Sequence, residues 1–310
     1  MPHPTADVTN GPIFFESQVP GEVGTDVFRI NPDGTDLRNL TQDLPAAGGP
    51  FVSDDGTRVY FSVFADPLHP ENTNASSIYV MRPDGAGKVR LPLEPGASFP
   101  SVAGNTIVYR RCDLRLFQCT LRISQLDGSG ARLLVPETTA TSSPVISPDG
   151  QRVMYIGSSP DPSALATPGG LQVLTLATGA TSNVGTQLID QRMGTWAGNN
   201  AWSRNGSVIV AATGFPSYSP YLAAADGSGI ERVPWTGGQP QAVALSPDGR
   251  EVAVRAITNF LSDTPAGEFR LTRLDGTGER VVQTLSSEQV DTIRKWIVEG
   301  AKWPDDVVVQ

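Results

Sequence analysis

The chain of 310 residues is long enough for a large core, and its 32 Gly and 26 Pro residues indicate frequent turns. Acidic residues outnumber basic ones 32 to 23, so the net charge of −9 disfavours nucleic acid and anionic membrane surfaces as partners. Only two histidines occur, which removes most His-based metal sites and most catalytic systems that rely on a histidine base.

The N-terminal segment, residues 1–10, contains two prolines and no apolar stretch, so it does not have the composition of a signal peptide. No apolar run of about 18 residues occurs, and we expect no membrane span. The protein is therefore either cytosolic or exported by a leader that this chain lacks. A first strand is expected at His3–Val8, although Pro4 removes one donor from its ladder. The C-terminal run Val307–Val309 could supplement or replace that strand.

Two series of turns built around Gly alternate along the chain, and each series has six members. The glycines of the first series lie 51, 43, 51, 48 and 49 residues apart and close the turns at Asn31–Gly34, Arg82–Gly85, Leu126–Gly128, Ala177–Gly179, Ala225–Gly227 and Leu274–Gly276. Those of the second series lie 45, 48, 46, 56 and 43 residues apart and close the turns at Thr9–Gly11, Ser53–Gly56, Ser101–Gly104, Ser147–Gly150, Ser203–Gly206 and Ser246–Gly249. This regular alternation indicates six repeats of one structural unit.

Short runs of β-branched and aromatic residues separate the turns, as in Val59–Phe61 and Ile78–Met81. Such runs, bounded by Gly, Pro and Asp, are typical of strands joined by hairpins. In the Pro-Asp-Gly turns, Pro presets φ, Asp caps the turn with its carboxylate and Gly takes the left-handed position. Each unit therefore holds four antiparallel strands, which we call A to D in chain order. Six such units predict an all-β, six-bladed β-propeller over residues 1–284.

The repeated segments also resemble a known family. PVISPDGQRVMYIGS and AVALSPDGREVAVRA are similar to the WD-like repeats of TolB-type six-bladed propellers, and the resemblance extends over residues 8–284. Repeats of this kind also precede the hydrolase domain of prolyl oligopeptidase relatives. TolB is periplasmic and engages a lipoprotein partner through its propeller, so the resemblance implies a binding role outside the cytoplasm.

The two cysteines, Cys112 and Cys119, bracket the segment DLRLFQ between two strand-like runs. Residues at the facing ends of a hairpin can lie at disulfide distance. We predict a bridge between them and, since disulfides persist in oxidising compartments, an extracytoplasmic location, periplasmic or secreted. The alternative is a pair of inert buried thiols.

The composition changes after residue 284. A capping box at Ser286 and Gln289, followed by apolar residues at helical spacing, predicts a helix over residues 287–299 within a C-terminal unit of residues 285–310. The segment SSEQVDTIRKWIVEGAKWP is similar to the last helix of planctomycete-type cytochrome c domains, but no C-x-x-C-H motif for haem attachment occurs. We expect the helix to pack across the last blade, or to dock on a partner.

No motif for catalysis is present. The sequence contains neither the G-x-S-x-G of serine hydrolases nor an aspartate-rich calcium loop, and the turn aspartates have a structural role. Oligogalacturonate lyases are built on similar repeats and hold a metal with several histidines, whereas His3 lies in an expected tail and His69 in a loop. We therefore predict no catalytic residue, metal ligand or cofactor.

Function is expected in the connections between strands. In a four-stranded meander the A–B and C–D turns lie on one face of the ring, and the B–C and D–A connections lie on the other. The latter are long here, at residues 62–77, 157–170, 185–200 and 258–267. They carry aromatic and charged residues of the kinds that interfaces use, although each could instead cap a blade. The candidate binding residues are Phe64, His69, Asp190, Arg192, Trp196, Tyr218 and Trp235.

Two functional hypotheses follow. The favoured one is a non-catalytic, monomeric binding or scaffold module that holds a protein, peptide or glycan partner on the face with the long connections. The alternative is a metal-assisted or carboxylate-based lyase or hydrolase with its site at the mouth of the central channel.

Overall fold

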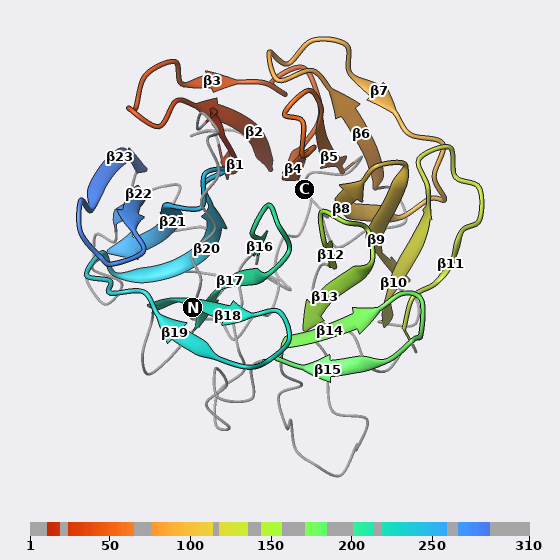
Figure 1. Cartoon of the computed structure of the whole chain (residues 1–310). Helices are drawn as coiled ribbons and strands as arrows, with labels where there is room; N and C mark the ends of the chain where they lie inside the picture. The colour runs from red at the N-terminus through yellow and green to blue at the C-terminus, as the bar shows by residue number, and fades with distance from the viewer. Residues whose placement is uncertain are drawn as a thin grey trace.

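The computed structural model describes residues 11–18, 24–64, 76–113, 118–135, 144–156, 171–184, 201–213, 219–258 and 266–285. These residues form six antiparallel sheets arranged as blades around a common axis, and the blades follow one another in chain order until blade 6 returns beside blade 1 (Figure 1). The predicted six-bladed propeller is therefore confirmed. Within the same residues, no helix is long and apolar enough to span a membrane.

The strands of each blade run outward in chain order. Blade 1 contains β1 (Ile13–Gln18), β2 (Thr25–Ile30) and β3 (Arg38–Asn39); blade 2 contains β4 (Ala47–Val52), β5 (Val59–Val63), β6 (Ser77–Met81) and β7 (Val89–Arg90); blade 3 contains β8 (Ala97–Ala103), β9 (Thr106–Asp113), β10 (Gln118–Gln125) and β11 (Arg132–Leu133). Blade 4 contains β12 (Val145–Ile146), β13 (Arg152–Ile156), β14 (Leu171–Thr175) and β15 (Thr181–Asn183); blade 5 contains β16 (Ala201–Trp202), β17 (Val208–Thr213), β18 (Ser219–Ala224) and β19 (Ile230–Arg232); blade 6 contains β20 (Gln239–Leu245), β21 (Glu251–Thr258), β22 (Ala266–Arg273) and β23 (Arg280–Leu285).

The hydrophobic core lies between neighbouring blades, so strand B is apolar on both of its faces. In β5, Phe61 packs against blade 1 in a cluster with Val27, whereas its neighbour Tyr60 packs against blade 3 in a cluster with Tyr109. Phe61 and Tyr109 are fully buried. This two-sided burial explains why the sequence shows short continuous apolar runs rather than a strict alternation of apolar and polar residues.

Blade 1 closes the ring by packing directly against blade 6. The rings of Phe15 and Phe269 lie 4.3 Å apart, and both belong to a buried cluster that spans the two blades. At the outer edge, a Cβ on Gly34 would lie 2.8 Å from the carbonyl oxygen of Val282, so only glycine permits this approach, and its φ of +85° also favours glycine. The ring is therefore closed by side-chain and backbone contacts in the described part of the chain.

Several predictions for the chain ends lie outside the described residues. They are the strand at His3–Val8, the alternative run Val307–Val309 and the C-terminal helix over 287–299. Blade 1 accordingly shows strands B, C and D only, since β1 corresponds to strand B by its pairing with β2.

The cysteine prediction is confirmed for the backbone register. Cys112 in β9 lies directly opposite Cys119 in β10. Hydrogen-bonded and non-hydrogen-bonded positions alternate along an antiparallel ladder. At the other end of this hairpin, Asn105 and Leu126 form a hydrogen-bonded pair, since the Leu126 N–H donates to the Asn105 carbonyl. The cysteine pair lies seven positions along the ladder, an odd number, so it occupies a non-hydrogen-bonded position, where the two strands are closest. The register suits a bridge, and the bridge itself stays a prediction.

Candidate functional site

The two faces of the propeller differ in how their connections are built. We call the face with the A–B and C–D turns the short-turn face, and the face with the B–C and D–A connections the long-loop face. On the long-loop face, His69, Asp190, Arg192, Trp196 and Tyr218 lie outside the described residues. Phe64 and Trp235 are therefore the two candidate residues whose positions the structure gives.

Trp235 belongs to the core rather than to the surface. It lies in the connection between β19 and β20, is 9% exposed and packs among Val233, Val254 and other residues between blades 5 and 6. Its indole N–H donates to the Gly238 carbonyl at 2.6 Å. The expectation that Trp235 offers its ring to a ligand is corrected, because the D–A connection here folds inward over the edge of blade 6.

Phe64 lies at the end of β5, where strand B reaches the long-loop face. Its N–H donates to the Ala46 carbonyl at 3.0 Å, and its ring lies 6.3 Å from the ring of Phe99. Phe99 comes from β8, strand A of blade 3, so the two rings join neighbouring blades close to the inner end of each blade.

Strand A of blades 2 and 3 carries the same irregularity near this face. In β4 the pair Gly49 and Pro50 stands opposite the single residue Phe61, and in β8 the pair Phe99 and Pro100 stands opposite Tyr109. The first residue of each pair has a positive φ, +60° at Gly49 and +53° at Phe99. Such bulges re-aim side chains, and they are common next to functional sites.

Each bulge is held by the preceding blade. Glu16 in β1 accepts a hydrogen bond from the Gly49 N–H, and Ser62 in β5 accepts one from the Phe99 N–H, both at 2.7 Å. Glu16 and Ser62 occupy the same position of strand B in consecutive blades, opposite Val27 and Ile78 of strand C. The position of Phe99 is thus fixed from blade 2, and its ring also approaches Gly49, where a Cβ would lie 2.9 Å from it.

The same strand-B position in blade 3 is Arg110. Its guanidinium carbon lies 5.1 Å from the centre of the Phe99 ring, a cation–π contact. The Arg110 Nε is buried and has no hydrogen-bond partner among the residues that the structure describes. Burial lowers the pKa of Arg110, and no described acidic group opposes this effect. We call Phe64, Phe99 and Arg110 together the Phe99 cluster.

The neighbouring arginines of blade 3 have acidic partners. Arg111 Nε lies 3.4 Å from a Glu94 carboxylate oxygen, and Arg122 Nε donates to Glu94 at 2.8 Å. The Tyr109 hydroxyl donates to the same carboxylate at 2.7 Å. Burial and this hydrogen bond to Glu94 raise the pKa of Tyr109 to about 12. Glu94 therefore ties the connection between β7 and β8 to blade 3, which is a structural task.

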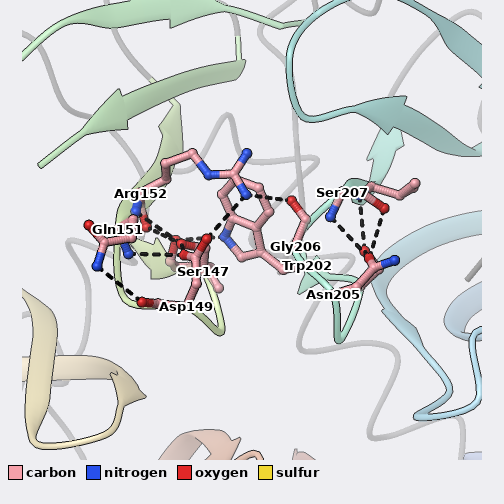
Figure 2. Close-up of polar contacts among 11 residues, drawn as sticks. Ser147, Asp149, Gln151, Arg152, Trp202, Asn205, Gly206 and Ser207 are labelled. Carbon is pink, nitrogen blue, oxygen red and sulfur yellow. Dashed lines mark hydrogen bonds and ion pairs between the residues drawn. The ribbon is translucent and has the colours of Figure 1, made fainter. Parts of the chain in front are cut away.

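Polar groups of the short-turn face satisfy one another. In the A–B turn of blade 4 the Ser147 hydroxyl donates to Asp149 at 2.5 Å and accepts from the Arg152 N–H at 3.0 Å, while Asp149 also accepts from the Gln151 N–H at 3.0 Å (Figure 2). The turn of blade 5 repeats this pattern with Asn205 in place of the aspartate. The predicted structural role of the turn carboxylates is confirmed there.

Arg152 joins the turns of blades 4 and 5. Its guanidinium donates to the Gly206 carbonyl at 2.7 Å and lies 5.0 Å from the centre of the Trp202 ring system (Figure 2). The Trp202 indole N–H in turn donates to the Val145 carbonyl at 2.9 Å. These contacts form a clasp between two blades, because one guanidinium nitrogen of Arg152 and the Trp202 indole N–H both donate to backbone carbonyls.

One acidic side chain of the short-turn face has a raised pKa, unlike the turn aspartates. Burial raises the pKa of Asp54 in blade 2, and the positive charge of Arg204 partly offsets the rise. Arg204 belongs to the A–B turn of blade 5, which is the blade opposite blade 2 in a ring of six. Among the described residues, no group of three or more His, Cys, Asp or Glu side chains is placed to hold a metal ion.

Sequence reasoning named Phe64 but missed Phe99 and Arg110, the other two residues of the Phe99 cluster. The available signal was a proline inside each of two innermost strands, in GGPFV and SFPSV. Proline cannot donate to a ladder, so at such a position it marks a bulge.

Comparison with known proteins gives similarity of fold. The sequence matches no protein-family model and no curated protein. Among solved structures, TolB from Acinetobacter baumannii superposes with a TM-score of 0.65 at 14% identity, over 90% of this chain and 64% of that one. The chain thus spans less than two thirds of the length of that TolB.

Two further structures are similar. A candidate TolB from Agrobacterium tumefaciens has a TM-score of 0.61 at 16% identity, over 81% of this chain and 85% of that one. Oligogalacturonate lyase from Vibrio parahaemolyticus has a TM-score of 0.54 at 10% identity, over 87% of this chain and 73% of that one. The resemblance to TolB-type repeats is thereby confirmed for the architecture, and the chain has the six-bladed propeller fold of the TolB proteins.

Proposed function

We propose that the protein is a binding or scaffold module that holds a protein, peptide or glycan partner on its long-loop face. The observation that carries this proposal is the difference in hydrogen bonding between the two faces. On the short-turn face the turn hydroxyls, carboxylates and Arg152 are directed at the protein itself. On the long-loop face the guanidinium of Arg110 has a buried nitrogen and no described acidic partner, whereas Arg29, at the short-turn end of β2, also has a buried Nε without a described partner but is paired with Asp36 at 3.1 Å.

The fold supports this proposal, since propellers present variable connections on a rigid ring. TolB-type relatives use such a ring to engage a protein, and we extend that role to this chain as part of the proposal. In this proposal the connection over residues 185–200 forms one wall of the site, with Asp190, Arg192 and Trp196 as contacts. Phe64, His69 and Tyr218 contribute from other connections of the same face.

The test is a binding screen with a matched control. Peptide and glycan arrays probed with the purified protein would identify ligands, and the double variant Arg192→Ala, Trp196→Ala should weaken their binding by about 2 kcal/mol or more, as is usual for aromatic and Arg hot spots. Its melting temperature should stay close to that of the unchanged protein. The control is Arg204→Ala on the short-turn face, which should bind normally. Unchanged binding with a lowered melting temperature in the double variant would overturn the proposal.

The alternative is a lyase or hydrolase. It is favoured by the similarity of the fold to oligogalacturonate lyase. Incubation of the protein with oligogalacturonate and divalent cations, with detection of unsaturated products by ultraviolet absorbance, tests this alternative directly. Turnover that a chelator abolishes would replace the binding proposal with the lyase one.

We further propose that Cys112 and Cys119 form a disulfide and that the protein works outside the cytoplasm, periplasmic or secreted. The opposed backbone register supports the bridge, and a closed ring of eight residues stabilises a hairpin mainly by restricting the unfolded chain, by about 2 to 3 kcal/mol. Titration of thiols in unreduced, denatured protein should detect none. Two free thiols would refute the bridge and remove the evidence that it gives for an oxidising compartment.

A further inference from the structure

We propose that Arg110 and Phe99 form a subsite on the long-loop face for a carboxylate carried on an apolar body, such as the C-terminal residue of a peptide. This inference rests on the proposed binding function and names the chemistry of one part of the site. It depends on three observations: the charge balance of Arg110, the support of its guanidinium by Phe99, and the backbone conformation of Phe99.

Arg110 has a buried Nε and no described acidic partner, unlike the two arginines that lie closest to it in blade 3. Arg111 and Arg122, on the same blade, both contact Glu94. In blade 6 the equivalent of Arg122 is Arg270, which is paired with Glu268 and Glu279 at 2.6 and 2.7 Å. A buried charge without a partner is destabilising. An anion that binds Arg110 would remove this penalty.

Arg255 occupies the same strand-B position in blade 6, but unlike Arg110 it contacts the next blade. It too has a buried Nε without a described partner, but its terminal nitrogen donates to the Glu16 carbonyl at 3.3 Å, and the charge of Glu16 favours its protonated form. Arg255 therefore belongs to the contact between blades 6 and 1. No corresponding contact to the next blade is described for Arg110.

Phe99 supports the guanidinium of Arg110 as a platform. A guanidinium held over a ring face keeps its N–H groups available for an in-plane, bidentate contact with a carboxylate. The position of the Phe99 ring is fixed, because Ser62 accepts a hydrogen bond from the Phe99 N–H and the ring packs closely against Gly49. The binding group is thus largely preorganised before a ligand arrives.

The backbone conformation of Phe99 also supports the subsite. A φ of +53° is uncommon for a bulky residue and costs about 1 kcal/mol or more. The equivalent bulge position in blade 2 is Gly49, which adopts φ +60° without this cost. Glycine would therefore satisfy the bulge in blade 3 as well, and the presence of phenylalanine indicates a use for its ring.

The surroundings favour an apolar carboxylate over a sugar acid. Phe64 and Phe99 present aromatic surface beside the cation, and the hydroxyls of a uronate would need hydrogen-bond partners that aromatic rings do not supply. N-acetylphenylalanine carries both required features, a free carboxylate and an apolar body. Its amide, N-acetylphenylalaninamide, differs only in charge.

The experiment is a ligand-observed NMR titration of the purified full chain. The unchanged protein should bind N-acetylphenylalanine at least about tenfold more tightly than the amide, and Arg110→Gln should weaken the acid by about tenfold. The matched control is Arg111→Gln, which alters the adjacent arginine that Glu94 already neutralises and should bind within about twofold of the unchanged protein. Phe99→Leu, which removes the aromatic face, should also weaken binding while circular dichroism stays unchanged.

Three results would overturn the subsite. They are equal binding of acid and amide, undiminished binding by Arg110→Gln, and absence of acid binding to a correctly folded protein. Tighter binding of galacturonate than of N-acetylphenylalanine would assign the subsite to a glycan and refute the peptide assignment. The proposed function is judged separately, because variants of residues 185–200 test the long-loop face without reference to Arg110.

Discussion

The short-turn and long-loop faces of this propeller are made from the same six repeats, yet they treat polar side chains differently. At the short-turn face a serine, an aspartate or asparagine, and the following N–H groups form closed networks in blades 2, 4, 5 and 6. At the long-loop face the equivalent strand-B position changes from blade to blade, as Glu16, Ser62, Arg110 and Arg255.

This difference indicates a division of tasks. A repeated, internally satisfied turn stabilises each blade in the same way, so it carries no information about a ligand. A strand-B position whose residue differs from blade to blade can serve a task that is specific to one blade. The predictions below test this division, beginning with a residue of the long-loop face that we assign to the scaffold.

The largest expected effect is at Trp235. Trp235→Ala should lower the free energy of unfolding by about 3 to 5 kcal/mol, because a buried indole is removed from the contact between blades 5 and 6. Urea denaturation measures the change. Trp235→Phe, which retains most of the apolar volume, should lose considerably less. A small loss in the alanine variant would return Trp235 to the ligand-binding surface.

A smaller effect is expected in the turn of blade 4. Ser147→Ala should cost about 1 to 3 kcal/mol, because the buried hydroxyl that accepts the Arg152 N–H is lost and that donor is left without its partner. Ser228→Ala, in an exposed turn of blade 5, serves as the control and should change stability by less than about 0.5 kcal/mol. Equal effects in both variants would contradict the scaffold role of the buried serine.

Replacement of Arg110, unlike that of Trp235 or Ser147, should not lower the free energy of unfolding. Arg110→Met removes a partly buried charge that has no described acidic partner, along with one cation–π contact. The free energy of unfolding should therefore stay within about 1 kcal/mol of its original value or rise. Chemical denaturation checks this expectation. A loss of more than about 2 kcal/mol would show that Arg110 has a structural partner, and the contrast between the two faces would fail at this position.

The smallest effect concerns the pH dependence of the turn in blade 2. Hydrogen bonds from Ser53 and Thr57 lower the pKa of Asp55 from 3.8 to about 2. Since the folded state has the lower pKa, the contribution of Asp55 to stability is present above pH 3.8 and disappears as the pH falls through about 2. Asp55→Asn should therefore flatten the acid limb of the stability profile in this interval. Asn205 fills the same position in blade 5, so the fold should tolerate the substitution.

The fold could be predicted from the sequence because its signal is local and repeated. Each turn glycine and each Pro-Asp pair acts within four residues, and six copies make the period visible, as the positive φ of Gly34 and Gly249 confirms. The placement of Cys112 opposite Cys119 could be predicted for the same reason, since one short hairpin determines it.

The candidate site could be predicted less well, because burial depends on contacts between blades. Tryptophan is a residue type that interfaces favour, but Trp235 is buried because it packs against Val254 of the next blade. Arg110 and Arg111 look identical in the sequence. Their environments differ because successive residues of a strand point to opposite faces of the blade, so Glu94 reaches only one of them.

The contact between Gly34 and Val282 is repeated elsewhere in the ring. Gly128 approaches the Pro92 carbonyl, and Gly276 approaches Pro234. In both cases the C–D turn of one blade contacts the chain just after the outer strand of the blade before it. The boundary between blades 6 and 1 is thus built like the others, although no peptide chain joins the described residues there. The order of the blades along the chain is therefore separable from the packing of the ring. A circular permutant that starts at a different blade should assemble the same propeller.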